Sequence, residues 1–310
     1  MSNDIRIGVA GAGATGGYLA ATLSAAGFDV TLLARGPSTT TIRDKGITVE
    51  QPDGSVLEGR PGHVVEAGDQ IEPVDIALFC VKSYDTAKAA KDVGNLVGSE
   101  GTILCLQNGV ANEEELAKVY GEARVLSGVL YIGAERTGPA HIACATSAKV
   151  IFGPYSPASR ASVAVWEPLR NALVAAGIDA TIDPQIRTAK WQKFLFNCGL
   201  NPLTAITGRR LGEIRSQPAG RDLYTRLVSE AIDAAQASGV ELPHDALEQA
   251  EATADRMDIS SSMAEDLEAG RGLELNAFTG HVLGLAEQHG TKASTTAVIH
   301  SVLQVLDLKK

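Results

Sequence analysis

A glycine-rich turn near the N-terminus does most to restrict the folds open to this chain. Residues 5–10 form a short apolar strand, residues 11–16 read Gly-Ala-Gly-Ala-Thr-Gly, and a helical pattern follows over residues 18–26. A G-x-G-x-x-G sequence between a strand and a helix is typical of the first turn of a dinucleotide-binding domain. This order predicts a parallel sheet covered by helices, with a dinucleotide cofactor. The alternative is a glycine-rich turn without a ligand.

Each glycine of the turn has an expected task. Gly11 permits the tight turn, Gly13 lets a pyrophosphate approach the backbone, and Gly16 allows close helix packing. The N–H groups at the start of the helix and the positive end of its dipole attract phosphate groups. The residues expected at the phosphates are Gly11, Gly13, Ala14, Thr15 and Gly16.

The residues at the end of the second predicted strand indicate whether the chain binds NAD or NADP. Residues 29–34 form this strand, and an NAD site usually carries an acidic residue at its end to bind the ribose 2′-hydroxyl. Here Ala34 and Arg35 stand in that place. Because a cation suits a 2′-phosphate, Arg35 predicts NADP(H). The alternative is a solvated charge in a loop.

Two further polar residues follow predicted strands. Residues 74–81 and 102–106 are apolar, and they run into Lys82 and into Gln107-Asn108-Gly109. Ligands of open α/β sheets bind at the carboxyl ends of the strands, so Lys82 and Asn108 are placed to reach the cofactor. The alternative for Asn108 is structural, since Asn-Gly is common in turns.

The remaining pattern divides the chain into two domains. Residues 46–51 and 55–59 flank Pro52-Asp53-Gly54 and predict an inserted β-hairpin. We also expect a helix over 84–97, strands over 125–131, 138–143 and 149–152 with mixed or antiparallel pairing, and a helix over 160–176. Later periodicity predicts helices over 187–200, 221–238, 244–257, 273–287 and 295–308. The fold class is therefore an α/β Rossmann-type domain over residues 1–183, followed by an all-α domain over residues 184–310.

The first helix of the second domain carries regularly spaced polar side chains. Lys193, Asn197 and Asn201 are each four residues apart, which places them on one helix face. Apolar residues fill the other faces, and buried amide or ammonium groups are costly without a partner. A substrate is one such partner, and an amphipathic helix with its polar face in water is the alternative.

A lysine in this place has a use in the reduction of a ketone. Hydride delivered to the ketone carbon leaves an alkoxide, which a positioned ammonium group stabilises and protonates. At the reference lysine pKa of about 10.4, Lys193 is charged at neutral pH. A charged lysine can therefore perform both tasks.

Composition excludes several classes of partner. The chain has 37 acidic residues against 27 lysines and arginines, so we expect neither nucleic-acid nor membrane binding, although a local basic pocket for a small anion remains open. Its four cysteines are far apart and lack metal-ligand spacing, which predicts reduced thiols and no metal site. The first residues do not resemble a signal peptide, and no apolar run approaches the length of a membrane span. We expect a cytoplasmic protein.

Several motifs together carry a resemblance to a known family. They are Gly11 to Gly16, Gln107-Asn108-Gly109, Trp191-Gln192-Lys193 with Asn197-Cys198 and Asn201 to Ala205, Gly208 with Gly212-Glu213, and Ser261-Ser262-Met263 with Glu274. In order and spacing, nearly the whole chain resembles the ketopantoate reductase (2-dehydropantoate 2-reductase) family. The resemblance implies NADPH-dependent reduction of a 2-oxo acid, with ketopantoate and (R)-pantoate as the expected substrate and product.

The resemblance also implies a role for each candidate residue. The catalytic residues are Lys193, as proton donor to the keto oxygen, and Glu274, which with Ser262 fixes the substrate hydroxyl and carboxylate. The other residues implied at the substrate and nicotinamide are Asn108, Asn197 and Asn201, and those implied on the NADP side are Arg35 and Lys82. Without the resemblance, Ser262 is a helix N-cap and Glu274 a solvated carboxylate at a helix start.

Departures from the family pattern leave alternatives open. Leu273 precedes Glu274, Leu275-Asn276-Ala277 follows it, and Ala293-Ser294-Thr295 replaces an expected Pro-x-Asn. A paralogous reductase of another 2-oxo acid is therefore one alternative. A 3-hydroxyacid dehydrogenase is a second, although its glycine-rich substrate loop is missing, and an NADPH-sensing binding protein is the non-enzymatic one. The oligomeric state stays open, with a homodimer as one alternative.

Overall fold

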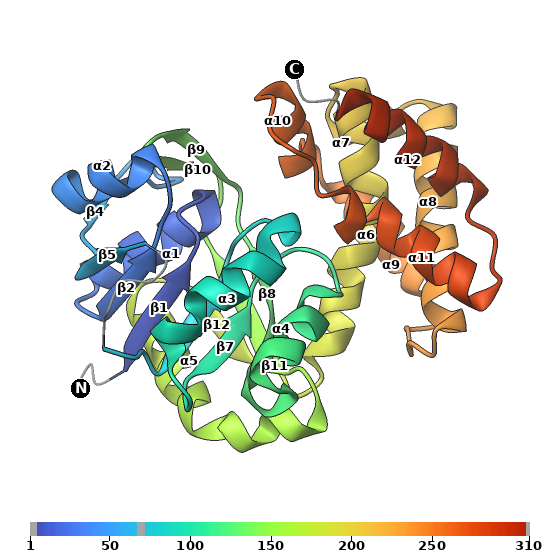
Figure 1. Cartoon of the computed structure of the whole chain (residues 1–310). Helices are drawn as coiled ribbons and strands as arrows, with labels where there is room; N and C mark the ends of the chain where they lie inside the picture. The colour runs from blue at the N-terminus through green and yellow to red at the C-terminus, as the bar shows by residue number, and fades with distance from the viewer. Residues whose placement is uncertain (1–4, 67–71, 308–310) are drawn as a thin grey trace. The chain divides into compact units, whose positions relative to one another are not determined.

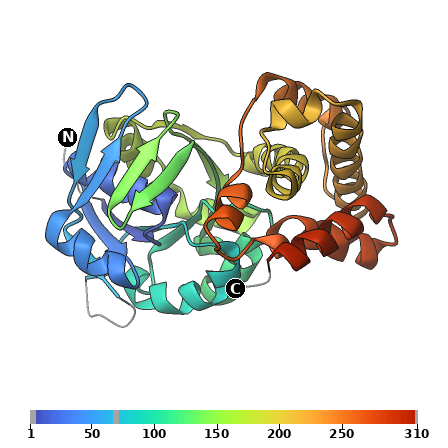
Figure 2. The ribbon, with the colours of Figure 1, turned by 90° about the horizontal axis from the view of Figure 1, so that it is seen from above.

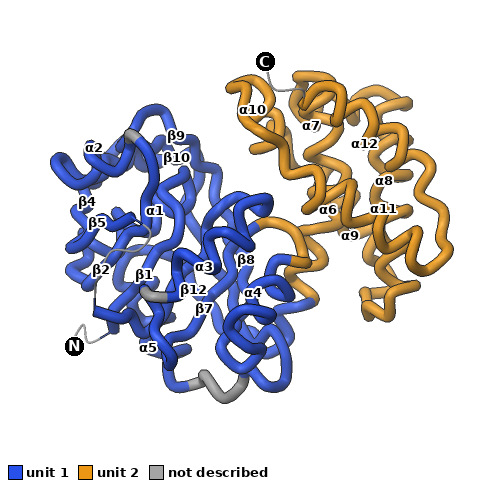
Figure 3. The backbone as a smooth tube through the Cα atoms, in the orientation of Figure 1, with its two compact units in different colours: residues 1–107, 112–187 blue, residues 108–111, 188–310 orange. Residues whose placement is uncertain are grey.

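The computed structural model describes residues 5–66 and 72–307. The chain forms two compact units, residues 1–107 with 112–187 and residues 108–111 with 188–310 (Figure 3). Each unit has its own buried apolar cores. The first is an α/β unit and the second is helical, as the sequence predicted.

The first unit is built on an eight-stranded sheet with the order β12-β11-β8-β7-β6-β1-β2-β5 (Figure 1). All neighbouring strands are parallel except β8 and β11, which are antiparallel. The strands are β1 (Arg6–Ala10), β2 (Asp29–Leu33), β5 (His63–Val65), β6 (Ile76–Phe79), β7 (Thr102–Cys105), β8 (Val125–Tyr131), β11 (Lys149–Pro154) and β12 (Asp179–Ile182). The four residues of β6 are all buried, as expected of a parallel strand with helices on both faces.

A second sheet joins segments that are far apart in the sequence. Its order is β4-β3-β10-β9, so the predicted hairpin, β3 (Ile47–Glu50) and β4 (Val56–Gly59), lies beside β9 (Ala134–Gly138) and β10 (His141–Cys144) (Figure 2). The single strand predicted over residues 138–143 is wrong, because the chain turns there between β9 and β10. A Cβ at Gly59 would clash with the backbone of α1 (Ala14–Ala25), which explains how this sheet approaches that helix so closely.

The other helices of the first unit are α2 (Pro37–Lys45), α3 (Thr86–Val97), α4 (Asn112–Tyr120) and α5 (Trp166–Ala175), with 3-10 turns η1 (Ser83–Asp85), η2 (Glu122–Arg124) and η3 (Pro157–Val165). The α-helix predicted over residues 160–176 is therefore wrong over residues 160–165, which belong to η3. The sequence also missed α2, α4, β5 and β12. Three threonines and a serine dominate α2, and these residues are weak helix formers that give little periodic signal.

The second unit is entirely helical. It contains α6 (Ile186–Thr207), α7 (Leu211–Arg215), α8 (Pro218–Ala237), α9 (Ala246–Arg256), α10 (Ser262–Glu268), η4 (Leu275–Ala277), α11 (Thr279–His289) and α12 (Ser294–Leu306). The prediction for residues 187–200 was too short, because α6 continues through Pro202. The helix predicted over residues 273–287 is wrong in its first turn, where Glu274 and Phe278 have non-helical backbone angles.

Candidate active site

The loop between β1 and α1 leaves its backbone open to a ligand. Gly11 has a φ of +107°, which favours glycine, and a Cβ at Gly16 would clash with the carbonyl oxygen of Gly11. Gly13 caps α1 in an extended conformation without a side-chain hydrogen bond, and a Cβ placed there would have no atom within 4 Å. The first N–H groups of α1, including those of Ala14 and Thr15, therefore have the arrangement that suits a phosphate.

The arginine after β2 has a partner that the sequence did not reveal. The guanidinium of Arg35 forms an ion pair with Asp92 of α3 through Nη2. The side chain is about two-fifths exposed, and a guanidinium has three further N–H donors on Nε and Nη1. Asp92 thus orients Arg35 without using all of its donors. Nearby along the chain, Ser38 of α2 accepts a hydrogen bond from Nη1 of Arg136 on β9, at 3.3 Å.

A buried amide joins the chain after β6 to the chain after β7. Nε2 of Gln107 donates to the carbonyl oxygen of Val81 at 2.9 Å and to Oγ1 of Thr86 at 2.7 Å. Oγ1 of Thr86 in turn donates to Oδ1 of Asn112 at 3.2 Å. Val81 and Gln107 immediately precede Lys82 and Asn108, so this network fixes the backbone beside both candidates.

The turn at Asn108 does not require an asparagine. Gly109 has the positive φ, +90°, whereas none of the non-glycine residues described has one. The tolerance of asparagine for the left-handed region therefore does not explain Asn108. This observation weakens the purely structural interpretation of Asn108.

The polar face of α6 is buried. Asn197 is 7 % exposed and Asn201 is 3 % exposed, so the amphipathic-helix alternative with a solvated face is wrong for these two residues. Their amide groups share the face of α6 that also carries Lys193. Burying a polar group without a hydrogen bond costs about 1–3 kcal/mol, which makes these amides candidates for ligand binding.

Lys193 differs from a solvated lysine. Burial, and to a smaller extent the like charge of Lys190, together lower its pKa to about 8. The sequence-based expectation of a pKa near the reference value was therefore wrong, because it ignored both effects. Lys190, one turn earlier on α6, is 6 % exposed and was not among the predicted site residues. At neutral pH most Lys193 side chains still carry the proton. Their pKa is closer to neutral pH than that of a solvated lysine, and a general acid works best when its pKa lies near the operating pH.

The back of α6 is set by an aromatic ring of α8. A Cβ at Gly199 would clash with the ring of Tyr224, so the glycine lets the ring lie directly against the helix between Asn197 and Asn201. The guanidinium of Arg215 lies over the Tyr224 ring, 4.6 Å from its centroid, and the Tyr224 hydroxyl donates to the carbonyl oxygen of Ala250 on α9 at 3.2 Å. Tyr224 thus packs against α6, a contact that the sequence did not reveal.

Two adjacent serines have different environments. Oγ of Ser261 accepts a hydrogen bond from the N–H of Ala264 at 3.2 Å and lies 2.7 Å from Oγ1 of Thr204 on α6. Ser261 is therefore the N-cap of α10, and it ties that helix to the one carrying Lys193. Ser262 is the first residue of α10 and is exposed, so the N-cap alternative applies to its neighbour.

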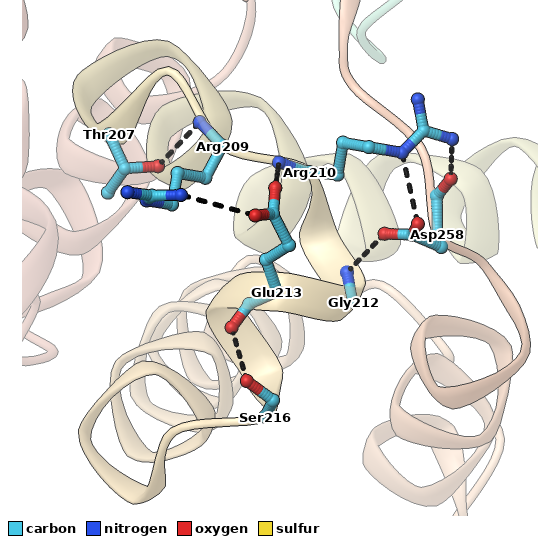
Figure 4. Close-up of polar contacts among 7 residues, drawn as sticks. All are labelled: Thr207, Arg209, Arg210, Gly212, Glu213, Ser216 and Asp258. Carbon is cyan, nitrogen blue, oxygen red and sulfur yellow. Dashed lines mark hydrogen bonds and ion pairs between the residues drawn. The ribbon is translucent and has the colours of Figure 1, made fainter.

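The chain before these serines is anchored by an aspartate (Figure 4). Asp258 accepts from Nε of Arg210 at 3.0 Å and from the N–H of Gly212 at 3.1 Å. Glu213 accepts from the N–H of Arg210 and from Nη1 of Arg209. A Cβ at Gly212 would lie 2.7 Å from an Asp258 oxygen, which explains the glycine there. This part of the family motif holds the chain that leads to Ser262.

Glu274 lies outside any α-helix and is 6 % exposed. The alternative of a solvated carboxylate at a helix start is therefore wrong. The N–H of the preceding Leu273 donates to Oδ1 of Asp307 at 3.0 Å, so a long-range contact holds this segment.

Other features of the described residues bear on the class of protein. All four cysteines are free thiols. Over residues 5–66 and 72–307 no cluster of histidine, cysteine and acidic side chains has metal-binding geometry. None of the helices in that part of the chain is both long and apolar enough to cross a membrane.

Comparison with known proteins gives consistent matches over the chain. The model of the family described as "Ketopantoate reductase PanE/ApbA" matches residues 7–157, and the model of its C-terminal domain matches residues 185–307. The 2-dehydropantoate 2-reductase of Halobacterium salinarum is 32 % identical over 287 residues, which are 92 % of this chain and 93 % of the relative.

Solved structures agree in fold. A PanE/ApbA family ketopantoate reductase from Ralstonia eutropha JMP134 has a TM-score of 0.85 and 27 % identity, covering 98 % of both chains. D-mandelate dehydrogenase with NADH and anilino(oxo)acetate has a TM-score of 0.89 with 98 % coverage of both chains, but at 19 % identity it shows only the fold. On these matches, the chain belongs to the ketopantoate reductase PanE/ApbA family.

Proposed function

We propose that this protein reduces a 2-oxo acid to a 2-hydroxy acid with NADPH, and that ketopantoate is its substrate. The observation that supports this most is the face of α6, where Lys193 stands in line with the buried amides of Asn197 and Asn201. Relatives that match over nearly the whole chain are named 2-dehydropantoate 2-reductase. A binding protein without catalysis gives no reason for a lysine with a lowered pKa in this place.

The reaction follows from the groups present. NADPH, when bound, would supply a hydride to the keto carbon. Lys193 donates its proton to the keto oxygen as charge develops there, which yields the hydroxyl group and leaves a neutral amine. Asn197 and Asn201 satisfy their amide groups by hydrogen bonds to substrate or cofactor. The neutral Lys193 then regains a proton from water before the next turnover.

The remaining candidates divide between cofactor and substrate. The open backbone at Gly13 and the first N–H groups of α1 fit a pyrophosphate. We propose that Arg35 and Lys82 bind the NADP side, that Asn108 and Ser262 contact the substrate end, and that Glu274 accepts a hydrogen bond from the substrate hydroxyl. The free thiols agree with a protein of the cytoplasm.

A panel of substrates tests the proposal. Purified protein is assayed by NADPH oxidation with ketopantoate, with unhydroxylated branched 2-oxo acids, and with 3-oxo acids as the control for the dehydrogenase alternative. We expect turnover of 2-oxo acids, with ketopantoate the best. NADPH binding without turnover of any acid would support the sensing protein instead.

We expect a preference for NADPH over NADH that depends on Arg35. Arg35→Asp places a second carboxylate beside Asp92, which repels a 2′-phosphate and suits a 2′-hydroxyl. The ratio of kcat/KM for NADPH to that for NADH should fall by about tenfold or more, because a hydrogen bond to a charged group contributes about 1.5–3 kcal/mol. The variant should then prefer NADH. Arg60→Asp, at an exposed arginine, is the control. An unchanged ratio in Arg35→Asp contradicts the assignment.

The pH profile should report the environment of Lys193. Because the protonated lysine is the general acid and its pKa is about 8, kcat for reduction should fall as pH rises through that value. Lys190→Gln removes a like charge, so the pKa of Lys193 should rise and the falling limb should move to higher pH. Lys190→Arg keeps the charge and serves as the matched control. A limb that stays in place in Lys190→Gln would exclude Lys190 as the cause.

A further inference from the structure

The segment that carries Glu274 is held from both ends by the C-terminal helix. At its start, the N–H of Leu273 donates to Oδ1 of Asp307, the C-cap residue of α12, at 3.0 Å. At its end, Oγ1 of Thr279 lies 2.8 Å from Nδ1 of His300 in the middle of α12. Between these two hydrogen bonds the backbone forms no α-helix and contains only the short 3-10 turn η4.

Both hydrogen bonds are partly buried. Leu273 and Thr279 are buried, and burial lowers the pKa of His300, which favours the neutral ring that shares one hydrogen bond with Thr279. Hydrogen bonds in such places persist because breaking them leaves a polar group without a partner. The position of the Glu274 backbone is therefore set by α12 rather than by its own sequence.

The helix that makes these ties is itself fixed at its N-terminus. Glu230 of α8 accepts from the N–H groups of Thr295 and Thr296, at 2.8 and 2.7 Å, and from the hydroxyl of Thr296 at 2.7 Å. Burial raises the pKa of Glu230, but these hydrogen bonds outweigh it and hold the pKa below its usual value. The carboxylate thus caps the positive end of α12, which packs on α8 (Figure 1).

We propose that Asp307 is a positioning residue that places Glu274 for recognition of the substrate hydroxyl, so that α12 determines substrate specificity through the Leu273 N–H. The inference rests on the proposed function, because it needs Glu274 to contact substrate. Because the Leu273 N–H is one residue before Glu274, holding it in place also restricts the position of Glu274. Such restriction matters, since a displacement of about 1 Å at a reacting group can cost about a hundredfold in rate. Asp307 itself touches no substrate in this account.

Two variants of Asp307 separate positioning from simple stability. Asp307→Ala removes the acceptor for the Leu273 N–H, while Asp307→Asn keeps an oxygen acceptor on a side chain of the same shape. The measured quantity is the ratio of kcat/KM for ketopantoate to that for its deoxy analogue, with NADPH. Asp307→Ala should lower this ratio about tenfold, mainly through the KM for ketopantoate, and Asp307→Asn should retain most of it. Gln304→Ala, at an exposed residue of the same helix, should leave the ratio unchanged.

A double-variant cycle makes the test specific. In the Glu274→Ala background the hydroxyl is no longer recognised, so adding Asp307→Ala should not change the ratio further. The inference is overturned if Asp307→Ala alone leaves the ratio unchanged, or if it lowers the ratio equally in the native and Glu274→Ala backgrounds. In either case the proposed function stands, provided that the native protein reduces ketopantoate. A native protein that reduces neither acid overturns the proposed function, and the inference with it.

Discussion

Replacement of Lys193 by alanine is expected to reduce kcat for any accepted 2-oxo acid by about a hundredfold or more, the range for loss of a positioned general acid. The proton would have to come from water, and the negative charge on the substrate oxygen would lose its ammonium partner. Single-turnover oxidation of bound NADPH, followed by absorbance, measures the chemical step. Binding of NADPH, followed by its fluorescence, should remain close to that of the native protein.

The choice of control decides what the result means. Arg187→Ala removes an exposed cation from the same helix and should leave the single-turnover rate unchanged. Lys193→Arg keeps a positive charge but has a pKa above about 12, so it should support oxyanion stabilisation with poor proton transfer. A native single-turnover rate in Lys193→Ala would remove this residue from the mechanism.

The second large effect is expected at Glu274. An unpaired buried group costs about 1–3 kcal/mol, so native protein should prefer ketopantoate over its deoxy analogue by about ten- to a hundredfold in kcat/KM. Glu274→Ala should collapse this preference without abolishing reduction. Glu268→Ala, at an exposed carboxylate of α10, should preserve it. If native protein reduces both acids equally well, 2-oxo acid reduction stands but ketopantoate is not the specific substrate.

Much of the first unit could be predicted because its signals are local. Parallel strands with both faces buried are short apolar runs, and β1, β2, β6, β7 and β8 all lie within the predicted ranges. Elements with weak local signals were missed or misjudged. The α2 helix is rich in threonine, and residues 138–143 look like one strand although they form parts of two.

The candidate site also has features that the local sequence predicts and features that it does not. The spacing of Lys193, Asn197 and Asn201 is a helical period, so their common face could be predicted from the sequence alone. The partners that tune the site are polar contacts between residues far apart in the chain, and no periodicity encodes them. Asp92 beside Arg35 and Asp307 beside Leu273 are separated from their partners by 57 and 34 residues.

The central claim is that hydride from NADPH reaches the keto carbon of a 2-oxo acid. The direct test incubates native protein with ketopantoate and NADPH in which both hydrogens at C4 of the nicotinamide are replaced by deuterium, and examines the product by NMR. Our account predicts a 2-hydroxy acid with deuterium on C2, formed in equal amount to the NADP⁺. Recovery of unreacted ketopantoate, or of a hydroxy acid without deuterium at C2, would contradict it.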